Sequence, residues 1–378
     1  MVIRTLRMQA FRAHADTTVT FAPKVNVFYG PNGAGKTNIL EAVHYACLSK
    51  SFLSSKDRYA LRKGCPHFDV EGEFVGQWRA NLSVRLVYAP GVGKRVFLNR
   101  SPLDRIAEIV GRLPVVVCSQ ADHALTSGGP EERRRFLNNI MSQARPVYLD
   151  NLLKYRRTLR QRNELLSKSR RRPGALAPAV LESWNAKLVA LGSRVIVDRL
   201  HFLTTFSGFL QKAYGLINSV AEHPTVDYRG LGPFVWDADE EAVATVFREK
   251  LHRAVRRERE LGRTLVGPHR DELTFRIEDF EVRRYASQGQ HRTFGMAIKL
   301  AQYFYLSDRL EEAPILLLDD VFDPLDKKRT EVFLSLLTSD AIGQALITGA
   351  ESDVFTSIIP FDQSEHLLQR VDGGSVTR

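Results

Sequence analysis

Residues 29–37 read YGPNGAGKT and directly follow the apolar run VNVF at 25–28. From Gly30 to Thr37 the stretch fits the pattern G-x-x-x-x-G-K-[ST], placed after an expected strand and before an expected helix. Glycines let the backbone curl so that successive N–H groups point inward, and the N-terminus of the helix adds its positive end. The stretch therefore predicts an α/β fold with a loop that binds the phosphates of a nucleotide.

Each residue of this loop has an expected place around the phosphates. Lys36 is expected to reach the β- and γ-phosphates of ATP, and the hydroxyl of Thr37 to bind Mg²⁺. The surrounding backbone is expected to come from Gly30, Pro31, Asn32, Gly33, Ala34 and Gly35. The alternative is a glycine-rich turn that matches by accident, and the flanking strand and helix patterns argue against it. A phosphate loop alone does not separate kinases, GTPases, helicases and transport ATPases.

A second motif, ILLLDD at 315–320, narrows the class of nucleotide-binding protein. Its apolar residues bring Asp319 to the end of an expected buried strand, where the carboxylate can hold Mg²⁺. Asp320 is then placed to act as a base toward the attacking water. Lys36 and these two aspartates are the expected catalytic residues. The alternative is a strand end followed by an aspartate-rich turn, which the phosphate loop upstream makes the weaker interpretation.

The third motif, SQGQ at 287–290, stands about thirty residues ahead of Asp319 and opens an expected helix. A serine and a glycine in that position resemble the signature motif of ABC-type ATPases. In that superfamily the signature of one subunit closes on the γ-phosphate bound by the other. The resemblance therefore implies that Ser287, Gly289 and Gln290 contact ATP across a homodimer. Four such residues taken alone are more typical of a polar turn.

Six segments in order along the chain resemble the RecF family of bacterial recombinational repair ATPases. They read LRMQAFRAH, VNVFYGPNGAGKTNILEAVHYACLSKSF, GGPEERRRFLN, LVGPHRDEL, YASQGQHRTFGMAIKLAQ and ILLLDDVFDPLD, and together they span nearly the whole chain. Asn38 after the threonine, the GPHRD block at 267–271 and the SQGQ.RT form of the signature are more specific to RecF than to ABC proteins at large. The resemblance adds Asn38 to the residues expected around the nucleotide.

The resemblance implies both an activity and a set of partners. It implies ATP-dependent dimerisation, slow ATP hydrolysis with Mg²⁺, and binding to gapped DNA or to junctions of duplex and single strand. It further implies a role in DNA replication, recombinational repair and the SOS response, with RecR and RecO helping to load RecA recombinase. A transport-type ABC ATPase subunit and an SMC-like structural DNA clamp are the alternatives. A small-molecule kinase would need a lid and an acceptor site, and would have no use for SQGQ.

The chain also departs from the family pattern at two places. Gln120 and Ala121 stand where RecF relatives usually carry Pro-Glu, and Gln120 is a candidate for the glutamine that senses Mg²⁺ in ABC proteins. Transporters place a histidine after the strand that follows the acidic pair, whereas this chain offers Thr348. No histidine switch is therefore assigned.

The charge of the chain favours polyanionic partners. In 378 residues there are 54 Lys and Arg against 43 Asp and Glu, a formal net charge of +11. Nucleic acid is the first candidate and an anionic membrane surface the competing one. Contacts to DNA phosphates are assigned to Arg133, Arg134, Arg156, Arg157, Arg170 and Arg171. Charge runs are usually solvated helix faces, and the run at 133–135 could instead serve the nucleotide or a dimer interface.

Periodicity along the chain predicts three segments. Strand patterns dominate 1–130 and return in 261–378, whereas 131–260 has helical spacing. We therefore expect an α/β fold, an ABC-type P-loop ATPase head whose mixed sheet comes from both chain ends, with an inserted helical lobe. The apolar spacing from Trp184 to Phe209 covers only about three and a half heptads, which favours a helical hairpin over a long coiled coil.

No stretch approaches the roughly 18 to 20 apolar residues of a spanning helix, and the first residues lack the apolar core of a secretory signal. The sequence thus predicts a cytoplasmic, nucleoid-associated protein without a membrane partner.

Overall fold

The computed structural model describes residues 1–77, 81–171, 177–217, 222–232, 238–322, 327–362 and 364–377. The chain divides into two compact units, each built from segments that are distant in sequence. The first contains Met1–Asp122, Leu216–Ser219 and Met296–Arg378, and the second His123–Gly215 and Val220–Gly295. No helix in the described ranges is long and apolar enough to cross a membrane.

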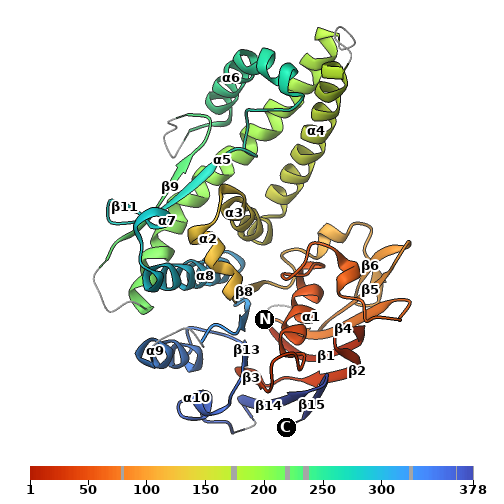
Figure 1. Ribbon diagram of the computed structural model, residues 1–378, viewed down its shortest axis with the longest axis vertical. Helices are drawn as coiled ribbons and strands as arrows, with labels where there is room; N and C mark the ends of the chain where they lie inside the picture. The colour runs from red at the N-terminus through yellow and green to blue at the C-terminus, as the bar shows by residue number, and fades with distance from the viewer. Residues whose placement is uncertain are drawn as a thin grey trace. The chain divides into compact units, whose positions relative to one another are not determined.

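A six-stranded sheet in the first unit joins the two ends of the chain. Its order is β15-β14-β3-β13-β12-β8, with β15 antiparallel to β14 and the remaining neighbours parallel (Figure 1). The strands are β3 (Val25–Tyr29), β8 (Val115–Ser119), β12 (Ile315–Asp319), β13 (Ala345–Gly349), β14 (His366–Asp372) and β15 (Ser375–Thr377). All residues of β12 and β13 are buried, which explains their continuous apolar sequences. The expected mixed sheet from both chain ends is thus confirmed.

A second six-stranded sheet of the first unit is antiparallel, in the order β2-β1-β4-β5-β6-β7 (Figure 1). Its strands are β1 (Val2–Phe11), β2 (His14–Thr20), β4 (Phe68–Val75), β5 (Leu82–Ala89), β6 (Gly93–Leu98) and β7 (Ser101–Pro102). The helix α1 (Lys36–Leu48) contacts strands of both sheets, and 11 of its 13 residues are buried. The unit also holds η1 (Asp57–Tyr59), η2 (Ile106–Ile109), η3 (Gln120–Asp122), α9 (Lys327–Thr338) and α10 (Asp353–Thr356).

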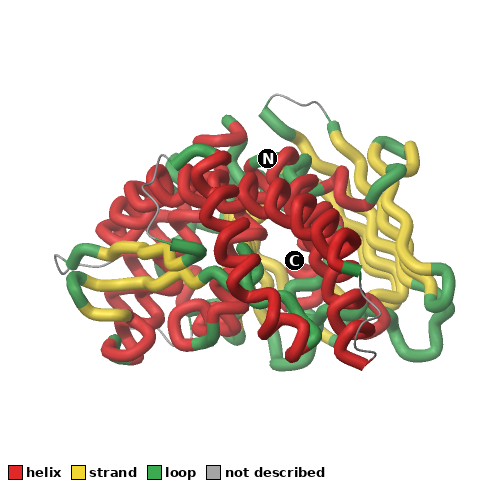
Figure 2. Tube along the Cα trace, turned by 90° about the horizontal axis from the view of Figure 1, so that it is seen from above, coloured by secondary structure: helices red, strands yellow, loops and turns green. Residues whose placement is uncertain are grey.

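The second unit is mostly helical (Figure 2). It contains α2 (His123–Ser127), α3 (Pro130–Ala144), α4 (Pro146–Arg171), α5 (Pro178–Ile217), α6 (Glu240–Leu261), α7 (Val282–Tyr285) and the start of α8 (Gln288–Leu310). The strands β9 (Pro224–Arg229), β10 (Glu272–Ile277) and β11 (Phe280–Glu281) form a small antiparallel sheet.

The two long helices α4 and α5 form the expected hairpin. Arg145 pairs with Asp198 at 2.7 Å, and Arg162 donates to Asn185 at 2.9 Å. Residue 145, at the start of α4, is paired with residue 198 of α5, whereas residue 162, farther along α4, is paired with the earlier residue 185. The two helices therefore run antiparallel. At 40 residues, α5 is longer than the periodic segment predicted, yet it packs against α4 of the same unit instead of extending into a long coiled coil.

The boundaries of the units differ from the predicted ones. The helical unit begins at residue 123 and continues to 295, beyond the expected end at 260. The reason is that β10 pairs along its whole length with β9, which lies inside the predicted helical segment. The SQGQ motif at 287–290 therefore belongs to the second unit and not to the C-terminal part of the sheet unit.

Candidate nucleotide-binding site

The three parallel strands β3, β13 and β12 bring the motifs of the first unit to one edge of its sheet. β13 lies between β3 and β12, so the carboxyl ends of these strands are neighbours. The loop that starts at Gly30 follows β3, Thr348 lies near the end of β13, and Asp319 ends β12. Ligands of open α/β sheets bind at this kind of edge.

The loop that follows β3 depends on its glycines. Gly30 has a φ of 146°, and a Cβ there would lie 2.2 Å from the carbonyl oxygen of Val371. Gly35 has a φ of 109°, and its Cβ would meet the His14 ring at 3.1 Å. Other residues would be strained at both positions. The glycines at the two ends of GPNGAG are therefore required by the fold as well as by the approach of a phosphate.

Lys36 lies inside the curl of this loop. Its side chain is buried, and Nζ donates to the carbonyl oxygens of Gly30 at 2.7 Å and Pro31 at 3.1 Å. The ammonium is thus already held in the loop by neutral acceptors. A phosphate oxygen would offer it a charged acceptor, which makes a stronger hydrogen bond.

His14 packs against the loop that follows β3 and was not among the residues predicted from the sequence. Its buried ring lies between two carbonyl oxygens, with Nδ1 2.9 Å from that of Gly374 and Nε2 3.2 Å from that of Gly35. Burial lowers the pKa of His14, since its effect exceeds that of the two carbonyl contacts. The signal was present in the sequence, because His14 ends LRMQAFRAH, one of the segments that resemble RecF.

The acidic pair at the end of β12 is organised around Thr348. The Thr348 hydroxyl donates to Asp319 at 2.9 Å and accepts the N–H of Asp320 at 3.0 Å. The Thr37 hydroxyl is close enough to Asp319 to lower the pKa of that carboxyl. Burial raises the pKa of Asp319, and Thr37 and the hydrogen bond from Thr348 oppose that rise. The structure thus brings together the two residues predicted to hold Mg²⁺, and assigns Thr348 a positioning role.

Gln120 lies next to this pair. Ser119 pairs with Asp319 in the parallel ladder of β8 and β12, and the Gln120 amide donates to the backbone oxygen of Asp320 at 3.1 Å. Asp122 holds the turn, since it accepts the Ser119 N–H at 2.7 Å and pairs with Lys299 at 2.9 Å. Gln120 is therefore at the acidic turn, with its amide nitrogen bound to backbone.

The SQGQ motif caps the start of α8 in the second unit. The Gln290 N–H donates to the Ser287 hydroxyl at 3.2 Å, and the Ser287 N–H donates to the Gln290 side-chain oxygen at 2.9 Å. This is a reciprocal capping box, which holds the first turn of the helix. Gln290 also donates to Glu222 at 3.1 Å. An N-terminus of this kind attracts anions, because its first N–H groups have no partner within the helix.

Arg133 and Arg134, from the first basic run, do not suit the predicted DNA contacts. Arg133 is buried and binds Glu272 through Nε at 2.8 Å and Nη2 at 2.6 Å. Arg134 is half-buried and donates to the backbone oxygen of Asp271 at 2.7 Å. Both side chains hold α3 against the segment that leads into β10. The prediction of a phosphate contact is therefore wrong for Arg133, and the Arg134 guanidinium is already bound to backbone.

The other four arginines assigned to DNA lie exposed on α4. They are Arg156, Arg157, Arg170 and Arg171. A shallow groove of about 590 Å³ follows one face of this helix, with Arg156, Arg160, Lys168 and Arg171 among the residues that line it. The spacing of these four residues, by multiples of three and four, places them on the same side of the helix. Glu164 is the acidic residue among those lining this groove.

Comparison with known proteins gives the family of this chain. A family model described as an AAA domain matches residues 5–169. The DNA replication and repair protein RecF of Salinibacter ruber is 52% identical over 378 residues, which is 100% of this chain and 92% of that protein.

Two solved structures share the fold of this chain. One is the recombination mediator protein RecF with ATP in the RecFOR pathway, which covers 100% of this chain and 97% of that one with a TM-score of 0.91 at 27% identity. An Smc head domain from Pyrococcus furiosus covers 100% of this chain and 95% of that one with a TM-score of 0.54 at 12% identity, so it supports the fold alone. The expected ABC-type head with an inserted helical lobe is thus confirmed. Identity of 52% over the full chain also establishes the closer relationship: the chain belongs to the RecF family of DNA replication and repair proteins.

Proposed function

We propose that this protein is an ATP-dependent DNA-binding protein of recombinational repair and replication-fork maintenance, and that ATP controls its pairing into a homodimer. The observation that carries the proposal is that one edge of the parallel sheet holds both the loop that encloses Lys36 and the acidic pair bound by Thr348. Family membership supports the biological process. The transport-type alternative is not favoured, since the relatives that match the full chain are RecF proteins.

ATP and Mg²⁺ are the proposed cofactors. The loop 30–38 would surround the phosphates, with Lys36 on the β- and γ-phosphate oxygens. Thr37 and Asp319 supply the hydroxyl and carboxylate oxygens that Mg²⁺ prefers, and a magnesium site of this type needs few protein ligands because the nucleotide and water supply the rest. The metal would neutralise charge on the phosphates. Gln120 remains a candidate for an additional contact to it.

Asp320 is assigned as the general base for slow hydrolysis of ATP. Asp320 follows Asp319 directly, and its backbone N–H donates to the Thr348 hydroxyl at 3.0 Å. This hydrogen bond fixes the position from which the Asp320 side chain extends. Asp320 would accept a proton from the attacking water, while Lys36 stabilises the charge on the phosphate. A φ of 49° at Asp320 means that the chain turns sharply at this residue. Such a conformation is uncommon for a non-glycine residue and is consistent with a positioned catalytic group.

The signature would connect ATP binding to pairing of two copies. In the proposed dimer, the start of α8 of one copy faces the γ-phosphate bound by the other. Ser287, Gly289 and Gln290 are the assigned contacts. Because ADP lacks the γ-phosphate, it would lose these contacts, and the affinity between the two copies would depend on the nucleotide.

DNA and two partner proteins complete the proposal. The exposed cations of α4 would bind DNA phosphates without reading sequence, which suits recognition of gaps or junctions. Cooperation with RecO and RecR in loading RecA is proposed from family membership, as is a cytoplasmic, nucleoid-associated location.

The molar mass in solution with ATP, with ADP and without nucleotide tests this function. We expect a monomer that doubles only with ATP and binds a gapped duplex most tightly in that state. Ser287→Arg should keep ATP binding to the monomer and prevent pairing, whereas Lys36→Arg should weaken both. Ser183→Arg, at an exposed serine on α5, is the matched control. A mass that does not depend on nucleotide, together with unchanged DNA affinity, would refute the switch.

A further inference from the structure

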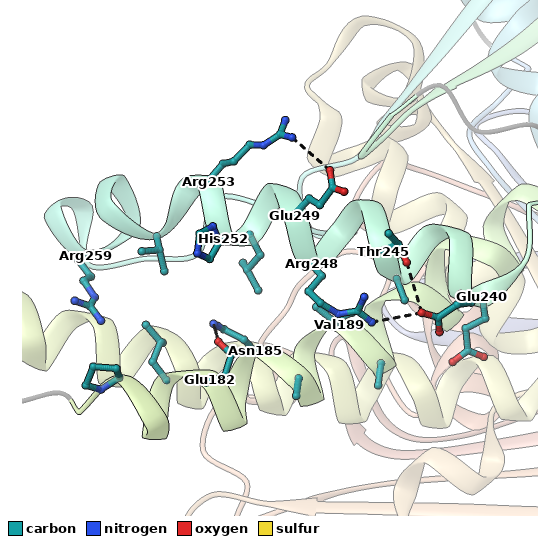
Figure 3. Close-up of a pocket in the computed structure, with 18 residues that line it drawn as sticks. Glu182, Asn185, Val189, Glu240, Thr245, Arg248, Glu249, His252, Arg253 and Arg259 are labelled. Carbon is teal, nitrogen blue, oxygen red and sulfur yellow. Dashed lines mark hydrogen bonds and ion pairs between the residues drawn. The ribbon is translucent and has the colours of Figure 1, made fainter.

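A groove of about 1000 Å³ lies between α5 and α6 in the second unit, and Figure 3 shows it from the side. Its lining comes from residues 178–190 of α5 and 240–259 of α6. At 1.5 Å per residue these segments are about 18 Å and 28 Å long. A groove of that length between two helices matches a third helix of about 12 to 18 residues, in the way that amphipathic helices bind hydrophobic grooves.

The floor of the groove is apolar. Leu181, Val189 and Leu251 line it and are buried. Ala186 and Ala190 lie one turn apart on the α5 side and are exposed. Small side chains at this spacing allow the backbone of another helix to come close, while the buried leucines and valine place no polar group beneath it. The floor therefore suits apolar side chains and offers nothing to a phosphate.

Most charges at the rim are paired within the unit. Arg248 pairs with Glu241 at 3.6 Å, and Arg253 pairs with Glu249 at 3.4 Å. Arg259 differs, because its Nε is buried and has no hydrogen-bond partner among the described residues. Figure 3 shows the Arg259 side chain extending from α6 into the gap toward α5. A buried charged donor without an acceptor is costly, so this end of the groove favours a ligand that carries a carboxylate.

We propose that the groove between α5 and α6 docks an amphipathic helix of a partner protein, with apolar side chains on the floor and an Asp or Glu bound to Arg259. His252 also lines the groove, about two turns before Arg259 on α6. The proposal goes beyond ATP-driven pairing and DNA binding, since it uses none of the residues assigned to those functions.

A display library of 18-residue helical peptides, selected on the full-length protein, tests the proposal. Enriched peptides are expected to carry apolar residues at i, i+4 and i+7 and at least one acidic residue. Ala186→Trp, which fills the groove from an exposed position, should lower their affinity at least tenfold, whereas Ser183→Trp on the outside of α5 should not. Arg259→Met should lower affinity to a similar extent, and Arg257→Met, exposed on α6 outside the groove, should not.

A double-mutant cycle makes the test specific to the carboxylate. Replacing the peptide's acidic residue by its amide should remove the effect of Arg259→Met. The proposal is overturned if the library yields no peptide sensitive to Ala186→Trp, or if Arg259→Met and Arg257→Met behave alike. It is also overturned if Ala186→Trp weakens binding to gapped DNA, which would make the groove part of the DNA surface. ATP-dependent pairing should be unchanged in all four variants, so this result is separate from the test of the switch.

Discussion

Replacing Thr348 with valine perturbs the acidic turn at a single point, because valine keeps the shape of threonine and lacks its hydroxyl. That hydroxyl donates to Asp319 at 2.9 Å and accepts the Asp320 N–H at 3.0 Å. A hydrogen bond to a charged group contributes about 1.5–3 kcal/mol, and one between neutral groups about 0.5–1.5 kcal/mol. Water can replace part of the second bond, since Asp320 is half-buried. We therefore expect the valine variant to lose about 2–3 kcal/mol of stability.

The same substitution should change the pH dependence of Mg²⁺–ATP binding. Burial already raises the pKa of Asp319, and the bond from Thr348 opposes that rise. Without the bond the pKa rises further, so Asp319 is protonated at a higher pH. Only the ionised carboxylate binds Mg²⁺ well, and affinity should therefore begin to fall at a higher pH in the variant. One pKa unit corresponds to about 1.4 kcal/mol, so a shift of about one unit is the expected size.

Urea unfolding and calorimetric titration with Mg²⁺–ATP between about pH 5 and 8 measure the two effects. Thr348→Ser retains the hydroxyl and serves as the control, with stability and pH profile close to those of the parent. Two results would refute the reasoning. One is a valine variant as stable as the parent with the same pH profile, and the other is a serine variant that loses as much as valine does.

Three further predictions concern the second unit. Arg199→Met leaves the Asp271 carboxylate buried without its partner at 2.7 Å, so urea unfolding should show a loss of about 3–5 kcal/mol. Burial lowers the pKa of His269 from 6.5 to about 4, so stability should fall as pH drops below 6.5 and level off near 4. At pH 5 the cost is about 2 kcal/mol, and thermal unfolding of His269→Gln against pH should lack it. Arg156→Gln with Arg171→Gln should weaken DNA binding and lower the slope of log affinity against log salt by about 2, measured by fluorescence anisotropy.

The motifs that could be predicted from sequence are those whose chemistry lies within a few consecutive residues. The loop at 30–37, the pair at 319–320 and the helix start at 287–290 each have their decisive neighbours in the same segment. In each case the pattern also fixes the local structure, because a phosphate loop joins a strand to a helix and a capping box starts one. The sequence thus predicted where these segments begin and what they contain.

Contacts between distant segments were not predictable in this way. The helical spacing of Ile39, Leu40, Val43 and Cys47 gives α1 one apolar face, yet nearly all of the helix is buried, since both sheets of the first unit pack against it. His14 and Thr348 reach the site from other strands, and neither belongs to a pattern that names its function. Residue spacing predicts on which face of its own helix or strand a side chain lies. What the side chain contacts depends on which other helix or strand packs against that face.

For the arginines too, contacts with distant segments decide what a local charge pattern cannot predict. Arg133 and Arg156 both lie in basic runs, although Glu131 and Glu132 directly precede Arg133 and no acidic residue adjoins Arg156. Arg133 is buried because Glu272 in β10 forms an ion pair with it at 2.6 Å, and Glu272 is distant in sequence. Arg156 lies exposed on a helix face with other cations. A basic run therefore indicates a DNA surface only where no distant carboxylate pairs with it, which is why four exposed cations on α4 carry the DNA proposal and the run at 133–135 does not.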